Sequence, residues 1–124
     1  MMVRGIRGAI TVERNAEEDI LQATSQLLDE IVQANGVVPD EIASVFITVT
    51  HDLDAAFPAG AIRKLSGWEL VPLMCSMEIP VQNSLPMCIR FMVMVNTTKG
   101  QDEIKHIYMN RAKALRPDLS KEAK

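Results

Sequence analysis

Side chains that bind metals or carry redox chemistry are scarce in this sequence. Among 124 residues there are two cysteines, Cys75 and Cys88, and two histidines, His51 and His106. A zinc site needs about four such ligands at a recognisable spacing, and these residues do not supply one. We therefore expect no metal site. The start of the chain has no continuous apolar region typical of a secretory signal, so we expect a cytoplasmic protein with reduced thiols.

Long apolar runs and a strong net charge are also missing. No stretch approaches the roughly 18 uninterrupted apolar residues of a membrane span. The net charge of -3 argues against a general affinity for nucleic acid or for anionic membranes. Glycine and proline number six each and form no linker, and the length is that of one domain, here residues 1–124.

The apolar periodicity predicts one long helix and several strands. The helix covers residues 16–35, with Asn15 as its N-cap and Gly36 as its stop. A helical turn is expected at 39–42 and a short helix between Pro58 and Gly67. Alternating or β-branched segments predict strands at 3–12, 44–50, 69–79, 87–97 and 106–115.

Strands outnumber helices in this prediction, and one long helix can cover one face of a sheet. We therefore predict an α+β fold with a mixed, mostly antiparallel sheet. Residues 116–124 are polar and terminal, so we expect them to form a flexible C-terminal tail.

Two charged residues interrupt apolar strands. If 69–79 and 87–97 pair as a hairpin centred on Ser84, then Glu78 and Arg90 lie opposite each other on one face of the sheet. Such a pair is either structural, as an ion pair or an edge charge that blocks aggregation, or part of a binding site. These two strands alone leave both alternatives open.

Arg7 interrupts a third apolar strand, between the small residues Gly5 and Ala9. Two arginines against one glutamate leave excess positive charge on the strands, and a buried, unpaired guanidinium is costly. The planar guanidinium suits a carboxylate or a phosphate. The strands therefore predict a site for a small anion, with a hydroxyl or an amine near Glu78.

No pairing of a nucleophile with a base stands out. Cys75 is a potential thiolate, but no motif places either histidine beside it. We expect His51 and His106 to lie in loops rather than to act as bases. Tyr108 is either a core aromatic residue or a hydroxyl donor to an anion, and its spacing does not decide between the two.

Five segments resemble the monofunctional, homotrimeric bacterial chorismate mutases of the α+β class. They are MMVRGIRGAITVE, FPAGAIRKLSGW, VPLMCSMEI, CIRFMVMV and HIYMNRAKALRPDL, in order and at matching spacing over nearly the whole chain. The resemblance implies a trimer packed into a pseudo α/β-barrel, with active sites between neighbouring chains and no cofactor. It also implies conversion of chorismate to prephenate, on the way to phenylalanine and tyrosine.

The resemblance further implies a role for each candidate residue. Arg90 would contact the ether oxygen and a carboxylate of the substrate, and Arg7 would help to hold a carboxylate. Glu78 would accept a hydrogen bond from the ring hydroxyl. The other implied substrate contacts are Cys75 at the hydroxyl, Tyr108 at a carboxylate, Phe57 along the ring, Arg63 near the mouth, and Leu115 and Arg116 in a closing tail.

Two positions depart from the family pattern. Gly60 stands where the family carries lysine, which puts a charge at the rim in doubt. Met74 stands where it carries threonine, so a polar contact beside Cys75 is in doubt as well.

The chemistry implied by the resemblance agrees with the residues themselves. A Claisen rearrangement needs no proton transfer, nucleophile, metal or cofactor. Negative charge grows on the ether oxygen in the transition state, so a fixed cation such as Arg90 lowers the barrier. Two alternatives are a non-catalytic trimeric anion-binding module and an imine or enamine hydrolase of similar trimeric architecture.

Overall fold

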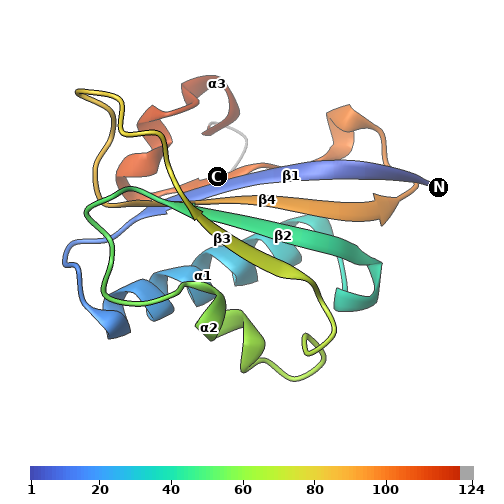
Figure 1. Cartoon of the computed structure of the whole chain (residues 1–124). Helices are drawn as coiled ribbons and strands as arrows, with labels where there is room; N and C mark the ends of the chain where they lie inside the picture. The colour runs from blue at the N-terminus through green and yellow to red at the C-terminus, as the bar shows by residue number, and fades with distance from the viewer. Residues whose placement is uncertain (121–124) are drawn as a thin grey trace.

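A five-stranded sheet forms the centre of the protein. The computed structural model describes residues 1–120, and the strand order is β3-β2-β4-β1-β5 (Figure 1). The two central ladders, β1–β4 and β2–β4, are antiparallel, whereas the edge ladders β2–β3 and β1–β5 are parallel. The strands are β1 (Met2–Thr11), β2 (Ile42–Val49), β3 (Leu73–Met77), β4 (Cys88–Thr97) and β5 (Ile107–Met109).

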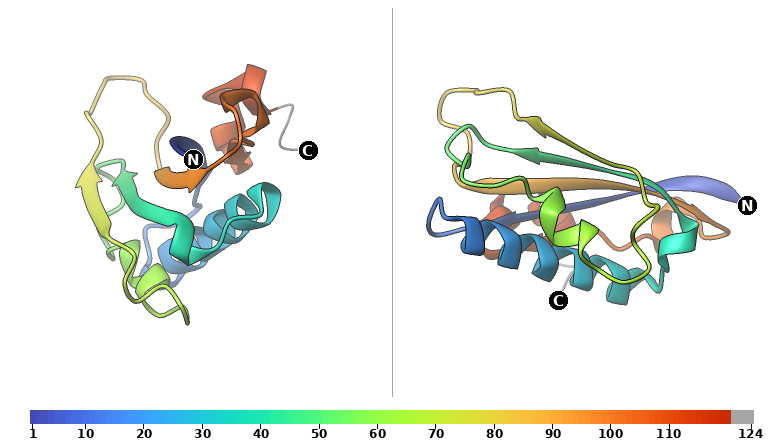
Figure 2. Two further views of the ribbon diagram at one scale, coloured as in Figure 1. Left: turned by 90° about the vertical axis from the view of Figure 1, so that its right-hand side faces the viewer. Right: turned by 60° about the horizontal axis from the view of Figure 1, so that its bottom comes forward.

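Two α-helices cover one face of this sheet. They are α1 (Glu17–Asn35) and α2 (Ala59–Arg63), and both lie on the same side of the strands (Figure 2). The prediction of an α+β fold with a mixed sheet and one long covering helix is therefore confirmed. The remaining helical segments are 3-10 turns η1 (Pro39–Glu41), η2 (Gln101–Glu103) and η3 (Asn110–Ala114), and a short helix α3 (Pro117–Ser120).

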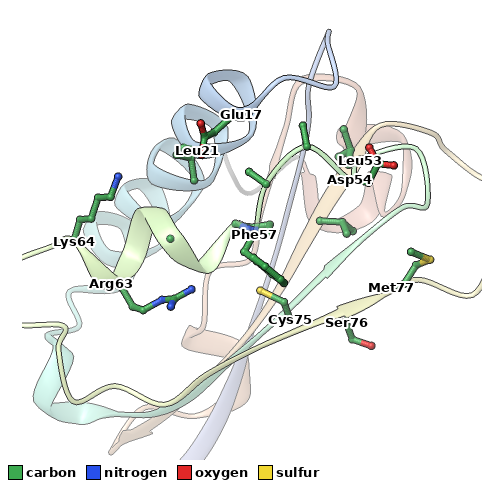
Figure 3. Close-up of a pocket in the computed structure, with 15 residues that line it drawn as sticks. Glu17, Leu21, Leu53, Asp54, Phe57, Arg63, Lys64, Cys75, Ser76 and Met77 are labelled. Atoms are coloured by element: carbon green, nitrogen blue, oxygen red, sulfur yellow. The ribbon is translucent and has the colours of Figure 1, made fainter.

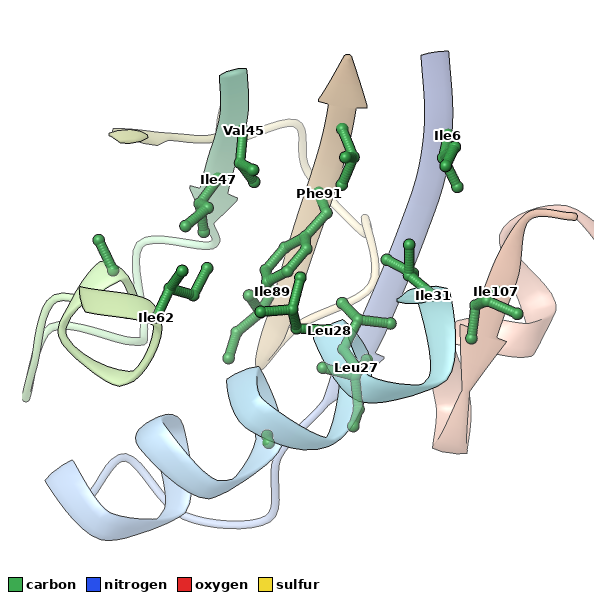
Figure 4. Packing of buried hydrophobic residues seen from close by; sticks show 14 of the residues in the cluster. Ile6, Leu27, Leu28, Ile31, Val45, Ile47, Ile62, Ile89, Phe91 and Ile107 are labelled. Carbon is green, nitrogen blue, oxygen red and sulfur yellow. The ribbon is translucent and has the colours of Figure 1, made fainter. Parts of the chain in front are cut away.

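The main hydrophobic core lies between the sheet and these two helices. Ile6 on β1, Ile89 on β4 and Ile31 on α1 are completely buried there (Figure 4). Gly8 allows the close approach of β1 and α1, because a Cβ atom at this position would lie 2.6 Å from Cδ1 of Ile31. The apolar stripe of α1 therefore packs directly against the backbone of β1.

The ends of α1 were predicted with mixed success. Gly36 ends the helix as expected, in the left-handed region at φ 61°, and its N–H donates to the carbonyl of Val32 at 2.8 Å. The prediction that Asn15 caps the helix is wrong. Its Oδ1 instead accepts hydrogen bonds from the backbone N–H groups of Asp54 and Ala55, at 3.1 and 3.0 Å. The Asn15 side chain therefore binds a loop that is distant in sequence and not the first turn of α1.

The predicted hairpin between the third and fourth strands is also wrong. β3 runs parallel to β2 through the connection that contains α2, and β2 then lies between β3 and β4. A parallel neighbour needs such a crossover connection, which a tight hairpin cannot provide. Both edge strands are shorter than predicted. β5 ends at Met109, because Asn110 adopts a positive φ of 56°.

The opposite face of the sheet carries η3 and α3 at one end, where Ala112 and Leu119 pack against Ala9 and Tyr108. Its centre, over β2 and the middle of β4, is not covered by the described helices, and we call this area the helix-free face (Figure 1). Register neighbours Phe46, Met74 and Met92 expose large apolar side chains there, and Arg7 is the next residue in the same row. Within residues 1–120, no helix is long and apolar enough to cross a bilayer.

Candidate active site

Four of the predicted site residues gather where the helix-free face of the sheet meets η3 and α3. Arg7, Glu78, Arg90 and Tyr108 line one cavity of about 320 Å³. The register explains the grouping, because Ala9 on β1 pairs with Arg90 on one side and with Tyr108 on the other. We call this group, together with Leu115 and Arg116, the arginine half-site.

Glu78 and Arg90 meet, although their strands do not pair. Oε2 of Glu78 lies 3.7 Å from Nε of Arg90, with side chains 25% and 45% exposed. Thr48 on the intervening strand β2 is the register partner of Arg90, and its hydroxyl donates a hydrogen bond to the same Oε2. The predicted meeting of the two charges is confirmed, but it occurs across β2.

Tyr108 presents a protonated hydroxyl beside the arginines. Burial raises the pKa of Tyr108, and the positive charges of Arg7, Arg116 and Arg90 oppose that rise. The phenol therefore stays an O–H donor at neutral pH. Its ring packs in a second small core with Ala9, Cys88 and Ala112, so Tyr108 is a core aromatic residue, and its contact with an anion stays a prediction.

The two predicted tail residues lie near this cavity. Leu115 lines an adjoining cavity of about 250 Å³ together with Glu78 and Arg90. Arg116 donates two hydrogen bonds to Asp118, at 3.2 and 3.0 Å, and this guanidinium lowers the pKa of the Asp118 carboxyl. Helix α3 occupies part of the predicted flexible tail, and residues 121–124 lie outside the described residues, so the flexibility of 116–124 stays a prediction.

The remaining three predicted residues line a different cavity, of about 710 Å³, beside α1 and α2 (Figure 3). Phe57 precedes α2 and is 74% exposed, Arg63 ends α2, and Cys75 comes from β3. Figure 3 shows the side chains of Phe57, Cys75 and Arg63 directed toward the same part of this cavity. We call these three residues the Phe57 half-site.

The two half-sites face opposite sides of the sheet. Cys75 pairs with the buried core residue Ile47 and packs against the main core on the helix side. Glu78 meets Thr48 and Arg90 on the other side. Within one chain, Cys75 and Glu78 therefore line different cavities.

Three residues that the sequence reasoning missed hold these side chains in place. Thr48 contacts Glu78, His106 accepts a hydrogen bond from the backbone N–H of Arg7, and Asn15 fixes the loop before Phe57. Strand alternation offered a signal for Thr48, because it shares a face with the exposed Phe46. The contacts of His106 and Asn15 join residues that are far apart in the sequence, so no local pattern indicates them.

The two departures from the family pattern lie in different surroundings. Gly60 lines the Phe57 half-site cavity, and a Cβ atom there would meet only Cδ2 of Leu21, at an ordinary 3.7 Å. Met74 is exposed and pairs with Phe46 on the helix-free face, away from Cys75.

Within residues 1–120, no group of three or more His, Cys, Asp and Glu side chains could hold a metal ion. The main cavity of the arginine half-site is lined instead by two guanidinium groups, one carboxylate and one phenol. These groups suit an anion that also carries a hydroxyl.

This fold and site define a small α+β protein with a cationic pocket for an organic anion. The chain belongs to the chorismate mutase type I family, whose pattern matches residues 3–119. It is 50% identical over 120 residues to the chorismate mutase AroH of Bacillus subtilis, covering 97% of this chain and 94% of that protein. It is also 50% identical to the AroH of Thermus thermophilus, over 95% and 97% of the two chains. A solved chorismate mutase from Clostridium thermocellum has a TM-score of 0.87 at 50% identity, over 90% of this chain and 98% of that one.

Proposed function

We propose that the protein is a chorismate mutase, an isomerase that rearranges chorismate to prephenate in aromatic amino acid biosynthesis. The observation that carries the proposal is Arg90, a guanidinium on the central strand β4, open to a cavity and 3.7 Å from Glu78. Both neighbours of β4 hold its backbone, so the strand that carries this cation is fixed before the substrate binds. A bacterial shikimate-pathway enzyme of this kind would work in the cytoplasm.

The rearrangement breaks the ether C–O bond and forms a C–C bond within one molecule. Arg90 would stabilise the negative charge that grows on the ether oxygen, as a preorganised cation needs little reorganisation. Arg7 and Tyr108 would bind the carboxylates and hold the two ends of the substrate close together. Glu78 would accept the hydrogen bond of the ring hydroxyl. No side chain needs to gain or lose a proton in this scheme.

We further propose a homotrimer whose active sites combine the two half-sites from neighbouring chains. Two observations support it. The half-sites lie on opposite faces of one chain, so a complete site needs a second chain. The helix-free face next to Arg7 exposes Phe46, Met74 and Met92, and an exposed apolar patch of this kind is typical of an interface. The pseudo α/β-barrel arrangement is part of the same proposal.

An assay of chorismate loss tests the activity directly. The unaltered protein should consume chorismate and form one equivalent of prephenate. Arg90→Ala should abolish nearly all turnover. The matched control is Arg14→Ala, which also removes an arginine but lies before α1 and pairs with Asp19 at 2.8 Å. A binding module would bind chorismate without consuming it, and an imine hydrolase would act only on imines.

Subunit mixing tests the shared site. One parent carries Arg90→Ala, and the other carries both Phe57→Ala and Arg63→Ala. Co-expressed trimers would contain some sites with both half-sites intact, so their turnover should exceed the sum of the parents. Light scattering should give about three times 13.8 kDa for each sample. Activity equal to the sum of the parents, or an active monomer, contradicts the proposal.

A further inference from the structure

One threonine hydroxyl connects the two charged residues of the arginine half-site. Thr48 lies on β2 between Ser76 of β3 and Arg90 of β4 in the register. Its Oγ1 donates to Oε2 of Glu78, which is also the oxygen 3.7 Å from Nε of Arg90. Within residues 1–120, no hydrogen bond is made to the other oxygen, Oε1. One carboxylate oxygen is thus held by the protein and the other is left available.

The backbone around this contact is fixed on both sides. The N–H of Glu78 donates to the carbonyl of Val49 at 2.8 Å, which extends the ladder between β2 and β3 beyond Met77. Thr48 is paired on both sides and, as a β-branched residue, has restricted χ1 rotation. The side chain of Glu78 keeps its own rotational freedom, and the threonine hydroxyl limits it.

The distance between Glu78 and Arg90 indicates what the hydrogen bond from Thr48 prevents. A charge-assisted N–H···O bond is about 2.7–2.9 Å long, and carboxylates tend to close on guanidinium groups in a bidentate pair. At 3.7 Å the Glu78 carboxylate stays outside that range. A carboxylate that closed on Arg90 would occupy its donors and offset the charge needed at the ether oxygen.

We propose that Thr48 is a positioning residue of the active site. Its hydroxyl holds the Glu78 carboxylate beside Arg90 without letting the two close, which keeps Oε1 free for the substrate hydroxyl and the Arg90 donors free for substrate oxygens. The inference rests on the proposed mutase function, and it assigns to Thr48 no direct contact with the substrate.

Replacement of the hydroxyl by a methyl group of the same shape tests the assignment. Thr48→Val should lower kcat/KM for chorismate about tenfold or more, since a hydrogen bond to a charged group is lost. Thr48→Ser keeps the donor and should stay within about twofold of the unaltered protein. The matched control is Ser44→Ala, which removes a hydroxyl from the same strand and face, away from the cavity.

A double-mutant cycle with Glu78 separates positioning from a general structural effect. In a Glu78→Ala background there is no carboxylate to hold, so adding Thr48→Val should change kcat/KM by less than about twofold. Urea unfolding of each variant shows whether the fold is intact. An equal loss in both backgrounds, or no rescue by serine, overturns the inference.

The activity of the unaltered protein distinguishes a wrong role for Thr48 from a wrong proposed function. If it consumes chorismate and Thr48→Val is as active, the proposed function stands and the role of Thr48 is wrong. If the unaltered protein consumes no chorismate, the proposed function is wrong and the role of Thr48 falls with it.

Discussion

The backbone N–H of Arg7 donates a hydrogen bond to Nδ1 of His106, with 2.9 Å between the two nitrogens. The contact lies just before the Gly8–Ile107 pair, where the β1–β5 ladder begins. Nδ1 can accept only while it carries no proton, so the imidazole is neutral here with its proton on Nε2. Burial lowers the pKa of His106, and the charges of Arg7 and Arg116 lower it further. The histidine and its charged neighbours therefore make this end of the site sensitive to pH.

The first prediction concerns stability against pH. Because folding lowers the pKa of His106, the unfolded chain binds more protons, and stability falls as the pH drops below the ordinary value of 6.5 toward the lowered one. His106→Asn keeps an acceptor that does not titrate, so its urea-unfolding free energy should fall less over this range. The control is His51→Asn, which removes the other histidine and leaves the Arg7 contact intact. Identical slopes for all three proteins would contradict the prediction.

The second prediction concerns Gly60. Nothing in the structure requires glycine here, since a Cβ atom has room and α2 is helical at this position. Gly60→Lys should lower the KM for the dianionic substrate by about two- to fivefold through an added rim charge. Gly60→Gln is the matched neutral control. Both variants replace a helical glycine, which destabilises a helix by roughly 0.5–1 kcal/mol relative to alanine. An equal KM in the two variants would show that charge at this rim is irrelevant.

The third prediction concerns Cys75 as a contact rather than a nucleophile. Neither histidine is hydrogen-bonded to its thiol, and the proposed rearrangement needs no covalent step. Cys75→Ala should therefore keep a substantial part of the turnover. Mass spectrometry of the unaltered protein during turnover should find no adduct. Cys88 is the internal comparison, since burial raises the pKa of its thiol to about 11 and keeps it unreactive. Complete inactivity of a folded Cys75→Ala protein would disprove this role.

The sequence predicts which face of the sheet each charged residue occupies. It does not predict which strands are neighbours in the sheet. Arg90 alternates with Ile89 and Phe91, which are buried, so its exposure on the other face follows from the two-residue period of a strand. The pairing of β3 with β2 depends on the crossover through α2, which is not a local property. Asn15 likewise found its partners in a distant loop.

The spacing of two residues in the sequence already indicated that the site residues divide into two half-sites. Cys75 and Glu78 are three positions apart along an extended segment, and an odd separation places side chains on opposite faces of a sheet. The resemblance nevertheless implied that both contact one hydroxyl. The proposed site between chains would reconcile the two statements by supplying the two residues from different chains, and the subunit-mixing experiment tests it.

The last prediction is that Arg90 makes the largest contribution to catalysis, through a charge in a fixed place. Ladders on both sides of β4 hold its backbone, and Thr48 and Ala9 are its register partners. Removing one preorganised donor from an oxyanion site typically costs about 2.7–4 kcal/mol, or roughly 10²–10³ in kcat, and loss of a full charge should cost at least that much. Arg90→Lys keeps the charge but loses the planar donor geometry, so it should also fail badly.

Citrulline at position 90 separates charge from shape. It keeps the planar group and most of the side chain and removes the positive charge. If charge dominates, the citrulline protein should bind chorismate with a modest loss of affinity while kcat falls by about 10² or more. Single-turnover kinetics and direct binding measurements on the same sample give the two quantities. A near-normal kcat in the folded citrulline protein would mean that Arg90 acts by shape and hydrogen bonding, and the electrostatic mechanism would be wrong.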